Sequence, residues 1–69
     1  MEQFSIIVDE VQYTITPIEG GSYGILEGNQ GLGHIFSKDE PGGVKWYSEE
    51  DLDPELVQKI GELIALYHL

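Results

Sequence analysis

The stretch FSIIVDEVQYTI, residues 4–15, alternates apolar and polar side chains along most of its length, on both sides of Asp9-Glu10. This period of two is typical of half-buried β-strands. A two-residue turn at Asp9-Glu10 would bring three apolar pairs together on one face of a hairpin. These pairs are Val8 with Val11, Ile6 with Tyr13, and Phe4 with Ile15. Glu10 is the weak position, because the turn needs a left-handed backbone that favours Gly or Asn, so a slightly longer loop stays open.

Short strands separated by turn residues continue after this hairpin. The predicted strands cover about 2–8, 11–18, 22–27 and 32–37, and the segment 44–47 can supply a fifth.

The register of the hairpin over residues 22–37 stays open. A symmetric turn pairs Ile25 with His34, whereas a bulge with a left-handed Gly31 pairs Ile25 with Ile35. Residues 38–43 end in Pro-Gly-Gly and are predicted to form an exposed loop.

The last third of the chain changes to a helical period. Apolar residues recur at helical spacing and predict one helix over about 54–67, with Asp53 as its cap and Pro54 at its first position. Leu52 can pack against Val57 at the helix start. The apolar stripe of this helix consists of Leu56, Val57, Ile60, Leu63, Ile64 and Tyr67.

Gly61 interrupts this helix at a cost of about 1 kcal/mol relative to Ala. A glycine at such a place indicates close approach of another group. Either Trp46 or a second copy of the chain fits that expectation.

Strands that bury one face and a helix with one apolar stripe are expected to pack as two layers. The predicted fold class is α+β: an antiparallel β-meander of four to five strands packed against one C-terminal α-helix. The 69 residues have room for one domain, residues 1–69. Because the chain has no cysteine, its stability must come from packing, capping or association.

The chain is strongly acidic, with 13 Asp and Glu against 3 Lys and Arg and a formal net charge of −10. Its widely separated lysines, Lys38, Lys45 and Lys59, argue against binding to nucleic acid or to anionic membranes. No apolar run approaches the roughly 20 residues of a spanning helix. The acidic start lacks the basic flank of a secretory signal. The sequence therefore predicts a soluble, cytoplasmic protein.

The motifs in the chain favour turns and caps over chemistry. The string from Gly20 to Gly24 has the letters of a G-x-S-x-G nucleophile elbow, but strand-like residues follow where that elbow needs a helix. His34 and His68 are too far apart to share a metal motif. We therefore predict no enzyme, no catalytic residues, no cofactor and no metal ligands.

A candidate partner surface lies at the helix entrance, at Tyr47, Glu49, Glu50 and Asp51. Acidic residues are denser there than elsewhere in the chain, and an aromatic ring borders them. We expect a non-enzymatic protein-interaction domain whose partner is a protein with a basic surface. The alternative is an acidic inhibitor that mimics nucleic acid, which would need rows of carboxylates on one face. A homodimer also stays open.

Overall fold

The computed structural model describes residues 3–67. Within this range, five strands form one antiparallel sheet in the order β1-β2-β3-β4-β5, and one helix follows them. Their bounds are β1 Phe4–Val8, β2 Val11–Ile18, β3 Ser22–Glu27, β4 Gln30–Glu40, β5 Gly43–Ser48 and α1 Pro54–Tyr67. The predicted α+β meander with a C-terminal helix is confirmed, and the fifth strand joins the sheet.

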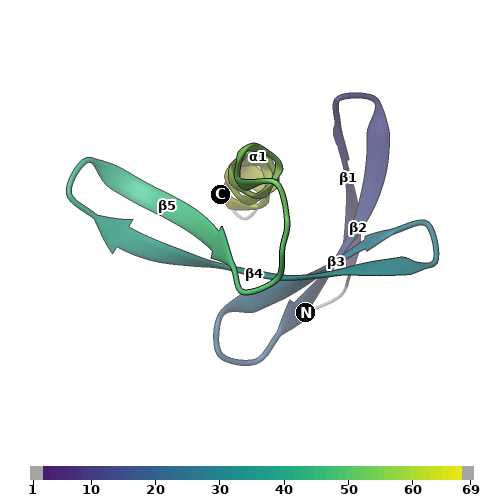
Figure 1. Cartoon of the computed structure of the whole chain (residues 1–69), viewed down its shortest axis with the longest axis horizontal. Helices are drawn as coiled ribbons and strands as arrows, with labels where there is room; N and C mark the ends of the chain where they lie inside the picture. Colours follow the sequence, from purple (N-terminus) through teal and green to yellow (C-terminus); the bar gives the residue numbers. More distant parts are fainter. Residues whose placement is uncertain (1–2, 68–69) are drawn as a thin grey trace.

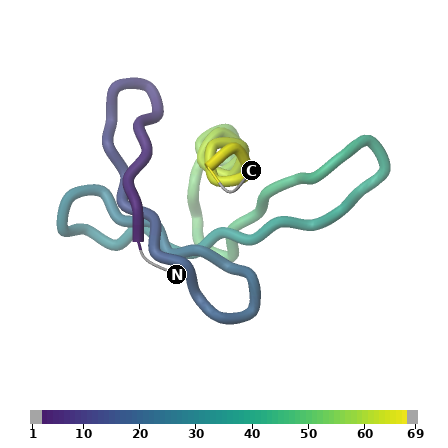
Figure 2. The backbone as a smooth tube through the Cα atoms, turned by 180° about the vertical axis from the view of Figure 1, so that it is seen from behind, coloured from purple at the N-terminus to yellow at the C-terminus, as the bar shows by residue number. Residues whose placement is uncertain are grey.

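The sheet is strongly twisted and curves around the helix like half of a barrel. Figures 1 and 2 show the β1–β2 and β4–β5 hairpins rising on either side of α1. The core lies between the helix and the concave face of the sheet. Its buried side chains are Ile6, Val8, Tyr13, Ile15, Ile25, Ile35, Val57, Ile60 and Ile64. Within the described residues, no helix is both long and apolar enough to span a membrane.

The first hairpin has the predicted register. Asp9 and Glu10 form its turn with φ angles of 50° and 70°, so both residues adopt the left-handed conformation without glycine. Val8 faces Val11, Ile6 faces Tyr13 and Phe4 faces Ile15. The longer loop is therefore not used, since apolar pairing on the buried face compensates for an unfavourable turn residue.

Both registers considered for the 22–37 hairpin are wrong. Ile25 pairs with Gly33, rather than with His34 or Ile35. Glu27 pairs with Gln30 across a tight turn, and a bulge at Leu32 then shifts the register between Leu26 and Ile25. The bulge has a physical reason: it lets Ile25 and Ile35 both face the core while Leu32 packs against it.

The prediction of an exposed loop over residues 38–43 is also wrong. β4 continues to Glu40 and β5 begins at Gly43, so the turn is confined to Pro41 and Gly42. Lys38 pairs with Lys45 in this extension. The charged residues in this part of the hairpin do not alternate with apolar ones. The period of two therefore gave no sign that the two strands extend this far.

The helix begins as predicted. The Asp53 carboxylate accepts a hydrogen bond from the Glu55 backbone N–H at 3.0 Å. The backbone carbonyl of Asp53 accepts one from the Val57 N–H, also at 3.0 Å. Pro54 is the first helical residue. Leu52 and Val57 line one small hollow beside the start of the helix. The bond from Glu55 N–H satisfies a donor that a helix start otherwise leaves unpaired, and the bond from Val57 N–H is the first of the helix itself.

Only part of the predicted stripe is fully buried. Val57, Ile60 and Ile64 are buried, while Leu56 and Leu63 are partly buried at the edge of the core. Tyr67 is 61% exposed, although its ring stacks on Phe4 with the centroids 4.1 Å apart. Because the sheet curves around α1, the side chains in the middle of the apolar face, Val57, Ile60 and Ile64, are buried more fully than those at its borders.

Candidate functional site

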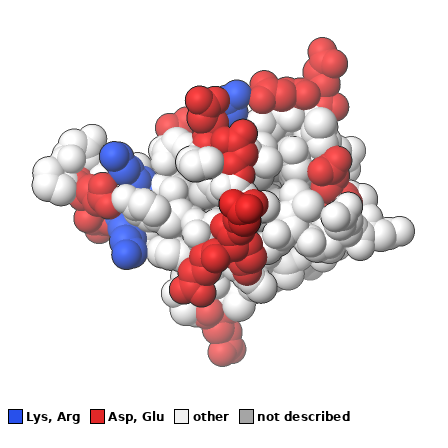
Figure 3. Space-filling view, viewed as in Figure 1, with Lys and Arg blue, Asp and Glu red and all other residues white. Residues whose placement is uncertain are grey.

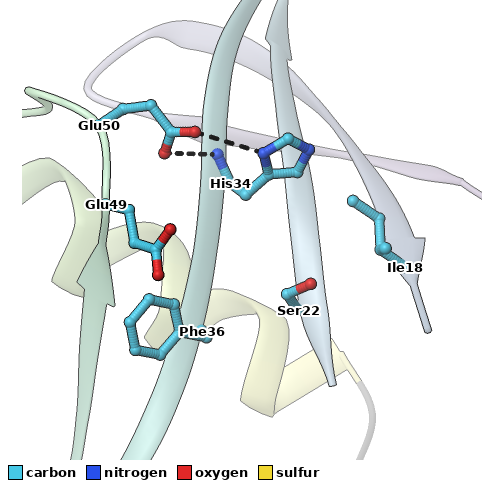
Figure 4. A pocket seen from close by; sticks show the side chains of 6 residues that line it. All are labelled: Ile18, Ser22, His34, Phe36, Glu49 and Glu50. Atoms are coloured by element: carbon cyan, nitrogen blue, oxygen red, sulfur yellow. Dashed lines mark hydrogen bonds and ion pairs between the residues drawn. The ribbon is translucent and has the colours of Figure 1, made fainter. Parts of the chain in front are cut away.

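A shallow pocket of about 340 Å³ opens on the face of the sheet turned away from the core, beside the segment that leads from β5 to α1. Strand alternation and pairing position its side chains: Ile18 pairs with Ser22, and Ser22 pairs with Phe36. The pocket is lined by Ile18, Ser22, His34, Phe36, Glu49 and Glu50, as Figure 4 shows. It therefore joins three strands and the helix entrance.

Glu50 is held at one side of this pocket by several hydrogen bonds. Its carboxylate accepts the His34 backbone N–H at 3.2 Å and lies 3.4 Å from His34 Nδ1. Ser48 Oγ lies 2.9 Å from the same carboxylate and 2.7 Å from the His34 carbonyl oxygen, so its single proton serves one acceptor at a time. The His34 backbone N–H, followed by the Ser48 hydroxyl, lowers the pKa of Glu50, because both favour the charged form.

Gly33 makes room for this carboxylate. Its φ is +144°, and a Cβ added there would lie 2.9 Å from the Glu50 carboxyl carbon. The bulge in β4 therefore creates a place where Glu50 can reach the backbone of the next residue, His34.

An aromatic pair, Phe36 and Tyr47, lies next to the pocket. The ring centroids are 6.1 Å apart with an interplanar angle of 29°. Lys38 Nζ lies 5.8 Å from the Phe36 centroid and 5.6 Å from the Tyr47 centroid. The Tyr47 hydroxyl donates a hydrogen bond to Glu40, which raises the pKa of Tyr47. The pair is therefore able to accept an ammonium group by cation–π attraction.

The structure separates the four residues predicted at the helix entrance. Glu49 and Glu50 line the pocket, whereas Asp51 and Tyr47 do not. Among the described residues, Glu50 has fixed partners, and no hydrogen bond or ion pair engages the exposed Glu49 or Asp51.

His34 and Phe36 were not predicted from the sequence as residues of this surface. Their spacing of two within a strand indicates one shared face, and that was the available signal. Contact of His34 with Glu50, however, spans 16 residues of sequence and depends on the bulge.

The pocket brings together a serine, a histidine and a carboxylate, which is the composition of a hydrolytic triad. Ser22 belongs to the G-x-S-x-G string, in which Gly20 and Gly21 lie in the turn and Ser22 begins β3. Within residues 3–67, no hydrogen bond joins Ser22 to His34, although such a bond is what activates a serine nucleophile. The His34 side chain is also 59% exposed. The geometry therefore supplies an oriented histidine without an activated nucleophile.

A second hollow of about 540 Å³ adjoins the pocket and shares Ile18, His34 and Glu50 with it. Its other lining residues are mainly apolar or glycine: Thr16, Gly24, Ile25, Leu26, Gly31, Leu32 and Gly33. The second hollow thus extends the pocket by an apolar strip beside the His34–Glu50 pair.

No group of three His, Asp or Glu side chains within the described residues could hold a metal ion. His68, considered from the sequence, lies outside those residues. The fold and the pocket thus define an α+β meander with an acidic and aromatic site on the convex side of its sheet. Comparison of the chain with protein-family models, curated proteins and solved structures found no match.

Proposed function

We propose that this chain is a non-enzymatic protein-interaction module that binds a basic segment of another protein. The binding surface extends from Tyr47 through Phe36 and Glu49 to Asp51, with Glu50 as its fixed border. The observation that carries this proposal is the unengaged carboxylate of Glu49 beside an aromatic pair. A carboxylate next to an exposed ring offers charge attraction and an apolar contact to the same cationic side chain.

Figure 4 supports the placement of this carboxylate, because it shows Glu49 directed toward the Phe36 ring. Lys38 already places its ammonium group near both rings of the aromatic pair. A lysine or arginine from a partner would take the place of Lys38 at these rings and would gain, in addition, the Glu49 carboxylate. This arrangement favours a cationic ligand over an anionic or a neutral one.

The charge of the whole molecule supports the same choice of partner. Figure 3 shows acidic side chains spread over the visible face, with the few basic ones toward its margins. A formal net charge of −10 attracts basic surfaces at long range and repels acidic ones. Long-range attraction raises the association rate, and the local surface then selects the partner.

The layout of the acids favours an interaction module over a mimic of nucleic acid. Acids lie in or beside the turns of all four hairpins: Asp9 and Glu10, Glu19, Glu27, and Asp39 with Glu40. Figure 1 shows that these turns point in different directions. A mimic of a phosphate backbone would instead need carboxylates in rows.

The test is affinity capture from the native lysate with three baits at several salt concentrations. The baits are the wild type, a variant combining Tyr47→Ala with Glu49→Gln, and Glu19→Gln as a control that also removes one charge. We expect the wild type and Glu19→Gln to recover the same protein at low salt. The combined variant should lose it, and high salt should release it. Circular dichroism must show that the variants keep their fold.

Recovery that is independent of both the substitutions and the salt would contradict the proposal. Loss with Glu19→Gln as well would mean that the total charge, rather than this surface, selects the partner.

A further inference from the structure

The two edges of the sheet are protected very differently. At the β5 edge, the Trp46 backbone N–H donates to Gln58 Oε1 of α1 at 3.1 Å. The charged side chain of Lys45 lies on the same strand. A charged residue and a covering side chain are common means by which proteins prevent another strand from pairing with an edge.

The β1 edge has no such protection among the described residues. Val8 pairs with Val11 across the two-residue turn. Residues that flank such a turn exchange backbone hydrogen bonds, and the alternation of an antiparallel ladder then turns the N–H and C=O groups of Ser5 and Ile7 away from β2. The strand reads FSIIV, without charge and without proline. These open groups are arranged to accept one more strand.

Apolar side chains surround this open edge. Ile7 is 67% exposed, and Leu66 on the last turns of α1 is 64% exposed. Both line a hollow of about 320 Å³, together with Val8, Lys59, Glu62 and Leu63. An open strand edge beside exposed apolar side chains is typical of a surface to which another chain binds.

We propose that β1 pairs with β1 of a second copy in an antiparallel, two-fold symmetric dimer centred on Ile6. Ser5 then exchanges backbone hydrogen bonds with the partner's Ile7, and Ile7 with the partner's Ser5. The exposed Ile7 side chains of the two copies become diagonal neighbours on one face of a continuous sheet.

The strand itself carries no charge that would oppose a second copy. No residue from Phe4 to Val8 is charged, so self-pairing creates no like-charge pair along the strand. Asp9, at the end of the strand, is already paired with Lys59 Nζ at 3.0 Å. In a register centred on Ile6, Asp9 lies opposite the partner's Gln3, which is neutral.

The small size of the chain and the symmetry of the assembly also favour a second copy as the strand that pairs with β1. A 69-residue chain without cysteine has a small core, and association is one of the means by which such small domains are stabilised. A two-fold axis uses both β1 edges, and on each β5 edge that remains Gln58 occupies the Trp46 N–H and Lys45 adds a charge. The assembly therefore ends at two subunits instead of growing into a fibre.

This dimer is independent of the proposed partner surface, which lies on β4, β5 and the helix entrance. The two also respond oppositely to salt. Salt weakens attraction to a basic partner, whereas it screens the repulsion between two acidic copies and strengthens the dimer.

The experiment is sedimentation velocity over a wide range of protein concentrations at low and high salt. It compares the wild type with Ile7→Lys and with Val44→Lys, whose site on β5 is 50% exposed. Both variants add one positive charge, so net charge alone cannot separate them. We expect the wild type and Val44→Lys to dimerise, more tightly at high salt. Ile7→Lys should raise the dissociation constant at least about tenfold, a change of about 1.4 kcal/mol.

Hydrogen exchange on the wild type provides a second measurement that does not depend on a variant. The amides of Ser5 and Ile7 should exchange more slowly as the concentration rises. A wild type that stays monomeric at every concentration and salt would overturn the proposal. A dimer that tolerates Ile7→Lys, or one that leaves the Ser5 and Ile7 amides unprotected, would overturn it as well.

Discussion

Gly61 of α1 and Trp46 of β5 are in such close contact that no side chain fits between them. A Cβ added to Gly61 would lie 2.0 Å from Trp46 Cγ, well inside van der Waals contact. Of the two neighbours considered from the sequence, the structure thus has Trp46 against this glycine. The indole ring occupies the volume that any other residue would need.

We therefore expect Gly61→Ala to destabilise the protein by about 1–3 kcal/mol. Helix propensity alone would make the substitution stabilising by about 1 kcal/mol, so the sign of the change separates packing from propensity. The measurement is chemical denaturation of Gly61→Ala alone and in a Trp46→Leu background. The loss should shrink or reverse when the indole is absent, and a higher midpoint for the single variant would contradict the expectation.

Ile64 is 1% exposed, so the loss of even one methylene from its side chain should destabilise the protein. We expect Ile64→Val to lower the free energy of unfolding by about 0.5–1.5 kcal/mol, since it opens space in the core. Ile18→Val removes the same methylene from a side chain that is 39% exposed, and it should change stability by less than about 0.5 kcal/mol. Equal effects of the two variants, measured by urea denaturation, would place the helix stripe outside the core.

Glu10 adopts φ +70° in the first turn, a conformation that is costly for any residue with a Cβ. Glu10→Gly should stabilise the protein by about 0.5–1 kcal/mol, because relief of this strain exceeds the added entropy of the unfolded chain. Glu19→Gly, which removes a charge from the next turn without relieving a positive φ, should not stabilise it. Thermal denaturation of both variants compares them directly, and a gain from Glu19→Gly alone would contradict the argument.

The hydrogen bonds to Glu50 predict a specific dependence of stability on pH. The pKa of Glu50 is lowered from 4.5 in the folded protein, so its contribution is complete above that ordinary value and is lost as pH falls through the folded pKa. Glu50→Gln should therefore be less stable than the wild type at neutral pH, and the difference should narrow below about pH 4.5.

Glu49→Gln is the matched control for this measurement, since no hydrogen bond engages Glu49 within the described residues. Its stability difference from the wild type should not show the same narrowing. Urea denaturation across the acid range measures both variants. A deficit of Glu50→Gln that grows on acidification would show that these hydrogen bonds do not favour the carboxylate.

Local sequence signals were sufficient for the first hairpin and for the helix. Only one register of residues 4–15 places all three apolar pairs on one face, and a slip of one residue would expose them. The start of α1 is equally local, because Asp53 and Pro54 act on backbone groups within the next turn. Such elements are predictable because the groups that stabilise them are close in sequence.

The tertiary structure alone decided the register of β3 with β4 and the site that depends on it. Glycines at positions 28, 31 and 33 leave that hairpin without a side-chain pattern strong enough to select one pairing. The bulge is selected by packing of Ile25, Leu32 and Ile35 around the core. Since Glu50 reaches His34 only across this bulge, and from 16 residues away, its role follows from long-range packing that no local spacing encodes.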